Sequence, residues 1–213
     1  MKSVPAWVEV RVVKLRFPLS GQVVSVNFSL GDKVKKGQVL ASLDNTILKK
    51  RQEKELKDYN KIRSQFEEIK AKGSSILLER AQADLEASVL AVEIADWETR
   101  HASIIAPADG VVVDDGGLVV GVYAAPASFE VRLEISGSQF IRAEVGQEVA
   151  YGFGKDDEAE FELDKVGGKF KGRVLRVLPA GKLGKFYVDA VVEGAEGLLA
   201  GCEGKLALKP AGK

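Results

Sequence analysis

Residues 31–44 read GDKVKKGQVLASLD, in which a short polar run lies between two turn signals and leads into an apolar segment. Gly31-Asp32 and Lys36-Gly37 are dipeptides of the kind that form tight turns. Val39–Leu43 has the apolar and β-branched composition of a strand, and it ends at Asp44-Asn45. The stretch therefore predicts short strands joined by glycine turns.

The same pattern continues upstream. Val8–Leu15 roughly alternates between apolar and polar residues, and Val23–Phe28 is rich in β-branched residues after Gly21. The 22 glycines fall mainly outside residues 45–101, which indicates turn-rich β-structure on both sides of a different kind of segment.

The period of the apolar residues changes at Thr46. Helical spacing relates Leu48, Leu56, Tyr59, Ile62, Phe66 and Ile69. Beyond Gly73-Ser74-Ser75, two sets of residues repeat every seven positions: Leu78, Leu85 and Val92, with Ala81, Ser88 and Ala95 offset by three. A further apolar stripe with the same repeat comprises Ile76, Ala83, Leu90 and Trp97. Sustained heptads predict an antiparallel coiled-coil hairpin.

The charges of the two arms are opposite in sign. Residues 49–72 contain nine Lys or Arg and five Asp or Glu, whereas residues 79–100 contain two and six. The net charges of +4 and −4 favour two helices that lie side by side, although solvated pairs contribute little energy. At a rise of ~1.5 Å per residue, each arm would be about 40 Å long, which predicts a projecting arm.

The chain returns to β-structure after the second arm. Ile104–Pro107 and Gly110–Val113 have strand character. Six further short strands are predicted, which together fit a small barrel: Phe129–Ile135, Glu148–Phe153, Glu160–Leu163, Phe170–Leu178, Phe186–Val192 and Lys205–Leu208.

Composition excludes several classes of function. Lys plus Arg and Asp plus Glu both number 31 in 213 residues, which argues against a nucleic-acid partner. The single cysteine, Cys202, and the single histidine, His101, exclude an internal disulfide and a metal site built from several Cys or His. No apolar run is long enough to span a bilayer, and Met1–Val10 has no signal-peptide core. The chain is therefore either cytosolic or a soluble piece of an exported protein.

Two strings resemble the halves of a biotinyl/lipoyl domain. Gly21–Val26 with residues 31–44 resembles the first half, and Ala106–Val112, APADGVV, resembles the opening of the second half. Val145–Val149 and Ala200–Leu206 resemble glycine-before-strand patterns of an adaptor barrel. This order of parts resembles that of the HlyD-type membrane fusion proteins, or periplasmic adaptor subunits. In these proteins a helical hairpin separates the two halves of a lipoyl-like domain, and a barrel follows.

The resemblance implies an α+β fold that is mainly β. A lipoyl-like sandwich would comprise residues 8–45 and 102–124, a coiled-coil α-hairpin would occupy residues 46–101 between its two halves, and a β-barrel adaptor domain would span residues 125–210.

It also implies a function without catalysis or cofactor. An adaptor would bind an inner-membrane transporter of the ABC or RND type, a TolC-like outer-membrane channel in double-membraned bacteria, and further copies of itself in a ring. Its location would be periplasmic or extracytoplasmic, and it would normally be anchored to the membrane. Residues 70–77 at the tip are the expected partner contacts, because exposed apolar residues beside a Gly-Ser turn suit docking. They are Lys70, Lys72, Gly73, Ser74, Ser75, Ile76 and Leu77. Ordinary helix-turn residues that pack on each other are the alternative.

Two other functions remain open from the residues. A biotin or lipoyl carrier would need an exposed lysine at the join between the halves, where the nearest lysines, Lys49 and Lys50, fall inside a predicted helix. A coiled-coil scaffold protein is the second alternative. No nucleophile–base pair, phosphate loop or carboxylate pair is present at a usable spacing, so the sequence predicts no enzyme.

Overall fold

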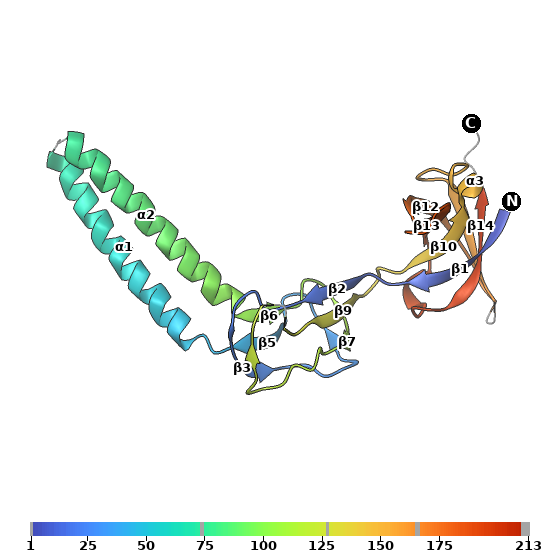
Figure 1. The fold of residues 1–213 in the computed structure, drawn as a ribbon, viewed down its shortest axis with the longest axis horizontal. Helices are drawn as coiled ribbons and strands as arrows, with labels where there is room; N and C mark the ends of the chain where they lie inside the picture. The colour runs from blue at the N-terminus through green and yellow to red at the C-terminus, as the bar shows by residue number, and fades with distance from the viewer. Residues whose placement is uncertain (1, 73–74, 127, 165–166, 210–213) are drawn as a thin grey trace. The chain divides into compact units, whose positions relative to one another are not determined.

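The computed structural model describes residues 2–72, 75–126, 128–164 and 167–209, and its contacts divide the chain into two units (Figure 1). One unit consists of Lys14–Leu133. The other combines Met1–Val13 with Glu134–Lys213. Each unit has its own apolar core.

Two four-stranded sheets form the β-part of the first unit. One has the order β2-β9-β7-β4, with β2 at Val12–Leu15, β9 at Val131–Ile135, β7 at Gly110–Asp114 and β4 at Lys33–Val34. The other has the order β6-β5-β3-β8, with β6 at Ser103–Ile105, β5 at Val39–Leu43, β3 at Gly21–Val26 and β8 at Tyr123–Ala124. Both sheets contribute buried apolar side chains, among them Val112, Leu133, Val23 and Leu40. The sheets therefore pack together as a small sandwich.

Each sheet contains strands from before and after the hairpin, which is why a domain interrupted by 55 or so residues still closes. β4 pairs with β7, and β5 pairs with β6. The turn at Gly37 joins the halves directly, because its N–H donates to the carbonyl of Ala106 at 2.8 Å. The N–H of Lys36 donates to Asp109 Oδ1, also at 2.8 Å. Gly31 and Gly37 adopt φ of 88° and 84°, which confirms the predicted glycine turns.

Two long helices leave this sandwich and return to it (Figure 1). α1 spans Thr46–Lys72 and α2 spans Ser75–His101. They pack against each other along their length, as the heptad pattern predicted. No helix in the described part of the chain is both long and apolar enough to cross a membrane.

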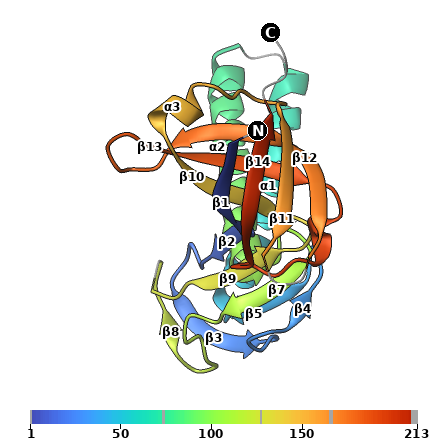
Figure 2. The same cartoon turned by 90° about the vertical axis from the view of Figure 1, so that its right-hand side faces the viewer.

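A closed six-stranded barrel forms the second unit (Figure 2). Its strand order is β1-β10-β13-β12-β11-β14, with β1 at Lys2–Glu9, β10 at Phe140–Gly146, β13 at Lys185–Val192, β12 at Lys169–Pro179, β11 at Glu158–Leu163 and β14 at Glu203–Lys209. A short helix, α3 (Gln147–Ala150), follows β10, and a 3-10 turn, η1 (Ala195–Gly197), follows β13. The buried core includes Val8, Ile141, Phe161, Leu206 and Leu208.

One glycine is required for the barrel to close at β12. A Cβ atom on Gly172 would lie 2.0 Å from the carbonyl oxygen of Val191 on β13. Any other residue would push β12 away from its neighbour, since real Cβ contacts are never that short.

Three predictions of local structure were wrong. The segment predicted as a strand at Glu148–Phe153 contains α3, because Val149, Ala150 and Phe153 have helical rather than alternating spacing. The segment predicted as a barrel strand at Phe129–Ile135 forms β9 of a sandwich sheet, and the barrel contains β10 instead, where no strand was predicted. The lipoyl-like segment was expected to start at residue 8, whereas Val8 is fully buried in the barrel core.

Candidate docking surface

The base of the hairpin is tied to two paired strands. β5 and β6 pair so that Ser42 faces Ser103, and their hydroxyl oxygens lie 3.0 Å apart. The N–H of Leu43 donates to the carbonyl of Ala102 at 2.8 Å. Both arms therefore start from adjacent strands of one sheet, and the direction of the hairpin is fixed by the sandwich.

Asp44 begins the first arm as a helix cap. Its carboxylate accepts a hydrogen bond from the N–H of Thr46 at 2.9 Å, which satisfies one of the free donors at the start of α1. The hydrogen bonds from Thr46 hold the pKa of Asp44 below its usual value.

The interior seam of the hairpin is asymmetric. α2 contributes three small residues that are almost fully enclosed: Ala81, Ser88 and Ala95. No residue of α1 is buried to the same degree. The larger side chains that face them from α1 stay partly exposed: Leu48, Tyr59, Ile62, Phe66 and Ile69. The small residues also leave a groove of about 550 Å³ along the hairpin, lined by both helices.

In the described part of the hairpin, the opposite charges of the two arms pair with each other only near the base. Arg51 of α1 pairs with Glu98 of α2 at 2.9 Å, and Gln52 Nε2 donates to Asp96 at 2.9 Å. The other ion pairs among the described residues of the hairpin lie within one helix, as between Lys57 and Glu53 at 2.6 Å. Along the described part of the arms, most of the +4 and −4 charge is therefore left for other contacts.

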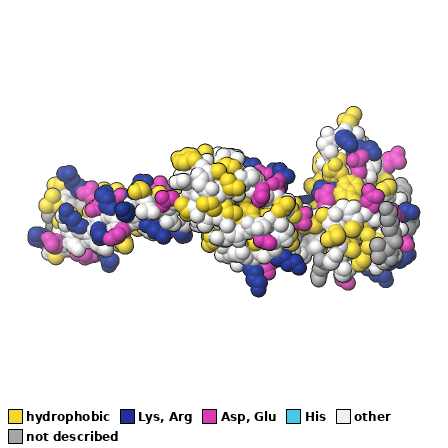
Figure 3. Space-filling model, turned by 90° about the horizontal axis from the view of Figure 1, so that it is seen from below, with side chains coloured by type: hydrophobic (Ala, Val, Ile, Leu, Met, Phe, Trp, Pro, Cys, Tyr) yellow, Lys and Arg dark blue, Asp and Glu magenta, His cyan; other side chains and the backbone are white. Residues whose placement is uncertain are grey.

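The second heptad stripe of α2 faces solvent. We call it the outer stripe: Ile76, Ala83, Leu90, Ile94 and Trp97. Ile76 is 83% exposed, Leu90 57% and Trp97 43%. Figure 3 shows hydrophobic side chains among the charged ones on the hairpin surface. Heptad stripes are the surfaces through which coiled-coil helices pack, and this one is left uncovered by the described residues of its own chain.

The predicted tip residues are only partly within the described residues. Lys70 and Lys72 end α1 in exposed positions, and Lys70 Nζ lies 5.9 Å from the centroid of the Phe66 ring. Ile76 and Leu77, in the first turn of α2, are 83% and 55% exposed. Ser75 begins α2, and Gly73 and Ser74 lie outside the described residues.

The turn that carries a prosthetic lysine in a carrier domain is replaced here by the hairpin. Lys49 and Lys50 both lie in the first two turns of α1 with exposed side chains. Among the described residues, no group of three or more His, Cys, Asp or Glu is arranged to hold a metal ion.

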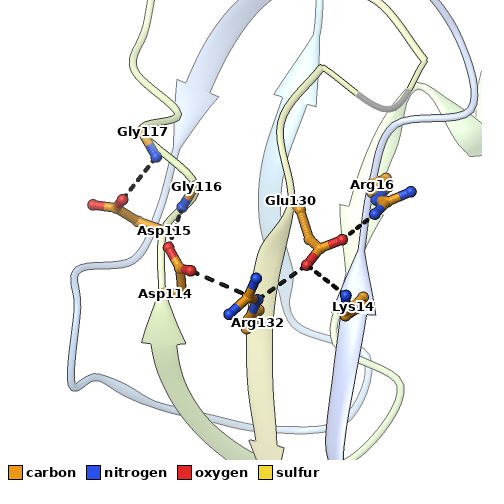
Figure 4. Close-up of polar contacts among 8 residues, drawn as sticks. All are labelled: Lys14, Arg16, Asp114, Asp115, Gly116, Gly117, Glu130 and Arg132. Carbon is orange, nitrogen blue, oxygen red and sulfur yellow. Dashed lines mark hydrogen bonds and ion pairs between the residues drawn. The ribbon is translucent and has the colours of Figure 1, made fainter.

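A cluster of charges in the sandwich was missed by the sequence analysis. Glu130, just before β9, pairs with Arg16, with Lys14 at 3.2 Å and with Arg132 at 3.0 Å (Figure 4). These hydrogen bonds, that of Arg16 first, lower the pKa of Glu130 to about 2. Arg132 also approaches Asp114 at 3.7 Å. The cluster cross-links the two strands β2 and β9 and their neighbour β7, which is a structural role.

The backbone beside this cluster depends on Gly116. A Cβ atom there would lie 2.5 Å from the carbonyl oxygen of Glu130, and its φ of 63° is left-handed. The carboxylates of Asp114 and Asp115 accept hydrogen bonds from the N–H groups of Gly116 and Gly117 at 2.9 and 2.8 Å (Figure 4).

The sequence matches a profile described as RND MFP, barrel-sandwich hybrid domain, over residues 11–131. This range covers more than half of the chain, including the sandwich and the whole hairpin. The chain belongs to the membrane fusion proteins. Members of this family are periplasmic adaptor proteins of efflux systems and are usually anchored to a membrane. The HlyD subtype is not distinguished by the match.

Solved structures confirm the fold of this membrane fusion protein over its full length. A MacA-MexA chimeric protein containing the Pseudomonas aeruginosa MexA α-hairpin domain superposes with a TM-score of 0.77 at 19% identity, over 99% of this chain and 82% of the other. A candidate efflux transporter from Bacteroides eggerthii gives 0.75 at 23% identity, over 98% and 68%. The membrane fusion protein Spr0693 from Streptococcus pneumoniae R6 gives 0.74 at 14% identity, over 100% of both chains. No protein of curated function matches the sequence.

Proposed function

We propose that this membrane fusion protein links an inner-membrane transporter of the ABC or RND type to an extracytoplasmic conduit, and that it works by position rather than by catalysis. In double-membraned bacteria the far end of that conduit would be a TolC-like channel. The observation that supports this role most strongly is the uncovered outer stripe on a hairpin whose two ends are held by one sheet.

The outer stripe suits a second copy of the chain. The outward side of α1 carries lysines at heptad-like spacing, Lys50, Lys54, Lys57 and Lys61, all of them exposed. The outer stripe of α2 is flanked by Glu79, Glu86 and Glu93, which repeat every seven residues and are also exposed. In a ring of parallel hairpins, α1 of one copy would therefore meet α2 of the next with complementary charge.

The lysines of α1 lie at the same levels along the hairpin axis as the apolar and acidic residues of α2 that they would meet. The pair Arg51–Glu98 sets which residues of the two antiparallel helices lie level with each other. On that basis Lys57 lies within one turn of the height of Leu90, and Lys61 within one turn of Glu86. Lysine stems can cover apolar surface while their ammonium groups reach the glutamates.

The energy available per copy is modest. Fully burying a leucine or isoleucine contributes about 1.5–3 kcal/mol, and the outer stripe residues are about half exposed before association. Exposed Lys–Glu pairs add only ~0.2–1 kcal/mol each. Such an interface would assemble reversibly. Its stability would increase if several neighbours closed a ring, or if a transporter bound several copies side by side.

The tip would contact the conduit. Ile76 and Leu77 present apolar surface next to Lys70 and Lys72, with no covering element among the described residues. A small apolar patch rimmed by charge is typical of a protein contact site.

Replacing Leu90 by Lys tests the proposed assembly. The new charge would face the lysines of the neighbouring α1, so we expect loss of self-association and of transport in cells that depend on the protein. Leu56→Lys is the matched control, because Leu56 is also exposed (48%) but lies on α1 away from the side that carries its four lysines. Sedimentation of both variants and a transport assay in complemented cells give the readouts. Equal behaviour of the two variants would contradict the ring interface.

A further inference from the structure

The turn between β12 and β13 holds a leucine entirely in solvent. Leu183 is 105% exposed, although it lies in an ordered hairpin within the barrel unit. The N–H of Ala180 donates to the carbonyl of Lys185 at 3.0 Å, and the N–H of Lys185 donates to the carbonyl of Lys182 at 3.1 Å. These bonds define a tight turn, so the outward position of Leu183 is set by the backbone.

The glycines on either side of the turn allow that shape. Gly181 and Gly184 adopt φ of 72° and 69°, in the left-handed region that other residues avoid. In Figure 2 this loop stands out from the barrel beside α3. The segment AGKLGK at 180–185 thus presents one aliphatic side chain at the end of a narrow projection.

Two lysines flank the leucine. Lys182 and Lys185 have side chains that are 73% and 48% exposed, and segment 180–186 contains no acidic residue. Both lysines pair with Glu144 on β10, at 3.8 and 3.3 Å. Exposed pairs of this length are weak, so the ammonium groups can exchange Glu144 for another anion at little cost.

An exposed aromatic residue lies next to the base of the same turn. Tyr151, which follows α3, is 78% exposed, and its ring centroid is 6.2 Å from that of Phe186. Tyrosine, leucine and lysine together make up the composition of a protein surface that sits at a lipid–water interface, where the ring and the aliphatic chain enter the lipid and the ammonium groups meet phosphates.

Strand register places all these residues at one end of the barrel. Lys185 pairs with Gly146 at the end of β10, and β10 runs antiparallel to β1, so this is the end at which β1 begins. β14 finishes there too, because Lys2 pairs with Leu208. Another exposed leucine, Leu199 (76%), lies at the opposite end, where Gly201 N–H donates to the carbonyl of Val8.

We propose that this end of the barrel rests on a membrane with anionic lipid headgroups, with Leu183 inserted between them, Tyr151 at their level, and Lys182 and Lys185 on their phosphates. A protein partner fits less well. Protein hot spots sit within a patch that excludes water, whereas Leu183 projects singly between charged and glycine neighbours. A soft lipid surface can enclose such a projection without a matching pocket. The proposal is independent of the hairpin and of the adaptor function.

Flotation of the whole chain with vesicles tests it directly. Vesicles of equal parts phosphatidylethanolamine and phosphatidylglycerol should bind the chain, and binding should weaken with added salt. Leu183→Ser should weaken binding about tenfold, since the lost aliphatic burial is large on this scale. The double variant Lys182→Gln with Lys185→Gln should bind anionic vesicles about 25-fold more weakly, at about fivefold for each lysine, and should change little on neutral ones.

Leu199→Ser is the matched control. It replaces another exposed leucine of the same barrel, at its opposite end, and should float like the unchanged chain. Leu183 makes no packing contact that its removal would disturb, so its Ser variant should also melt at the unchanged temperature. Failure of the unchanged chain to float, or an equal loss for Leu199→Ser, would overturn the proposal. If vesicles do not bind but Leu183→Ser prevents recovery of a transporter from solubilised cells, the turn contacts protein rather than lipid.

Discussion

Glu130 illustrates how single residues hold the sandwich together. Its side chain is only 16% exposed and is surrounded by Lys14, Arg16 and Arg132. Those cations come from β2 and β9 or their edges, so the carboxylate joins strands that are more than a hundred residues apart in sequence.

The lowered pKa of Glu130 predicts a specific dependence of stability on pH. A carboxyl whose pKa falls from 4.5 to about 2 on folding binds protons less readily in the folded state. Its contribution is therefore complete above pH 4.5 and is lost as the pH falls towards 2. We expect the melting temperature of the unchanged chain to fall more between pH 5 and 2 than that of Glu130→Gln. Parallel melting curves across this range would show that the cluster does not act through Glu130.

In the barrel, Asp189 resembles Glu130 of the sandwich, because it too is a carboxylate paired with cations from neighbouring strands. It is fully enclosed, and it accepts hydrogen bonds from Arg142 at 2.7 and 2.9 Å and from Arg176 at 2.9 Å. Arg142 also pairs with Glu9 at 2.8 Å and lies over the ring of Tyr187, 4.8 Å from its centroid. Such a pair is costly to break on one side, because the remaining charge is left shielded from water.

We therefore expect Asp189→Asn to lower the free energy of unfolding of the barrel by about 3 kcal/mol. Urea denaturation can be followed through Trp7, which lies in β1, in a Trp97→Phe background. Glu158→Gln is the control, since that carboxylate is 77% exposed and 4.0 Å from Lys209, and it should change the value by less than ~0.5 kcal/mol. A loss for Asp189→Asn no larger than for the control would mean that the network is not stabilising.

These residue-level clusters could not be predicted from the sequence. Glu130 meets Arg16 only because β2 and β9 are neighbours in a sheet, and that register depends on tertiary packing. No local pattern marks Asp189 as different from other aspartates. The cap at Asp44 could be predicted, because it acts on a backbone N–H only two residues away.

At the scale of elements, the hairpin was the most predictable part. Heptads and caps are local patterns, and α1 and α2 begin and end within the predicted segment 46–101. The barrel strands were harder, because short strands depend on partners far away in sequence. Val149, Ala150 and Phe153 were read as strand although their spacing is helical, and the one-turn helix α3 is too short for a periodic signal.

The exposed tip of the hairpin predicts a clean separation of function from folding. Replacing both Ile76 and Leu77 by Ser should abolish transport in cells while leaving the melting temperature unchanged, because both side chains are mostly exposed. Leu56→Ser is the control: Leu56 is 48% exposed in the middle of α1 and should retain transport. Normal transport by the tip variant, at normal protein levels, would remove the tip from the partner surface.

For the whole molecule, the order of the parts carries more information than any single part. A lipoyl-like half, a hairpin, a second half and a barrel follow each other in the sequence, and the structure shows both halves sharing the same two sheets. The matched profile covers the sandwich and hairpin, and the superposed structures extend the similarity to the barrel. Assignment to the membrane fusion proteins therefore follows from sequence and fold together.

The sequence indicates the binding partners of the protein only through its resemblance to a family. The outer stripe, the tip and the exposed lysines of α1 are proposed here as contact surfaces for other molecules, which a single chain does not contain. Physical chemistry defines what those occupants must offer: acidic or apolar helices for the hairpin, and anionic lipid for the Leu183 turn.

The proposed link to a transporter is tested most directly by isolating the natural protein from cells after cross-linking and identifying by mass spectrometry what is bound to it. The account predicts an inner-membrane transporter of the ABC or RND type together with further unmodified copies of the chain. Recovery of the chain with biotin or lipoate attached, or with soluble enzymes and no membrane transporter, would contradict it.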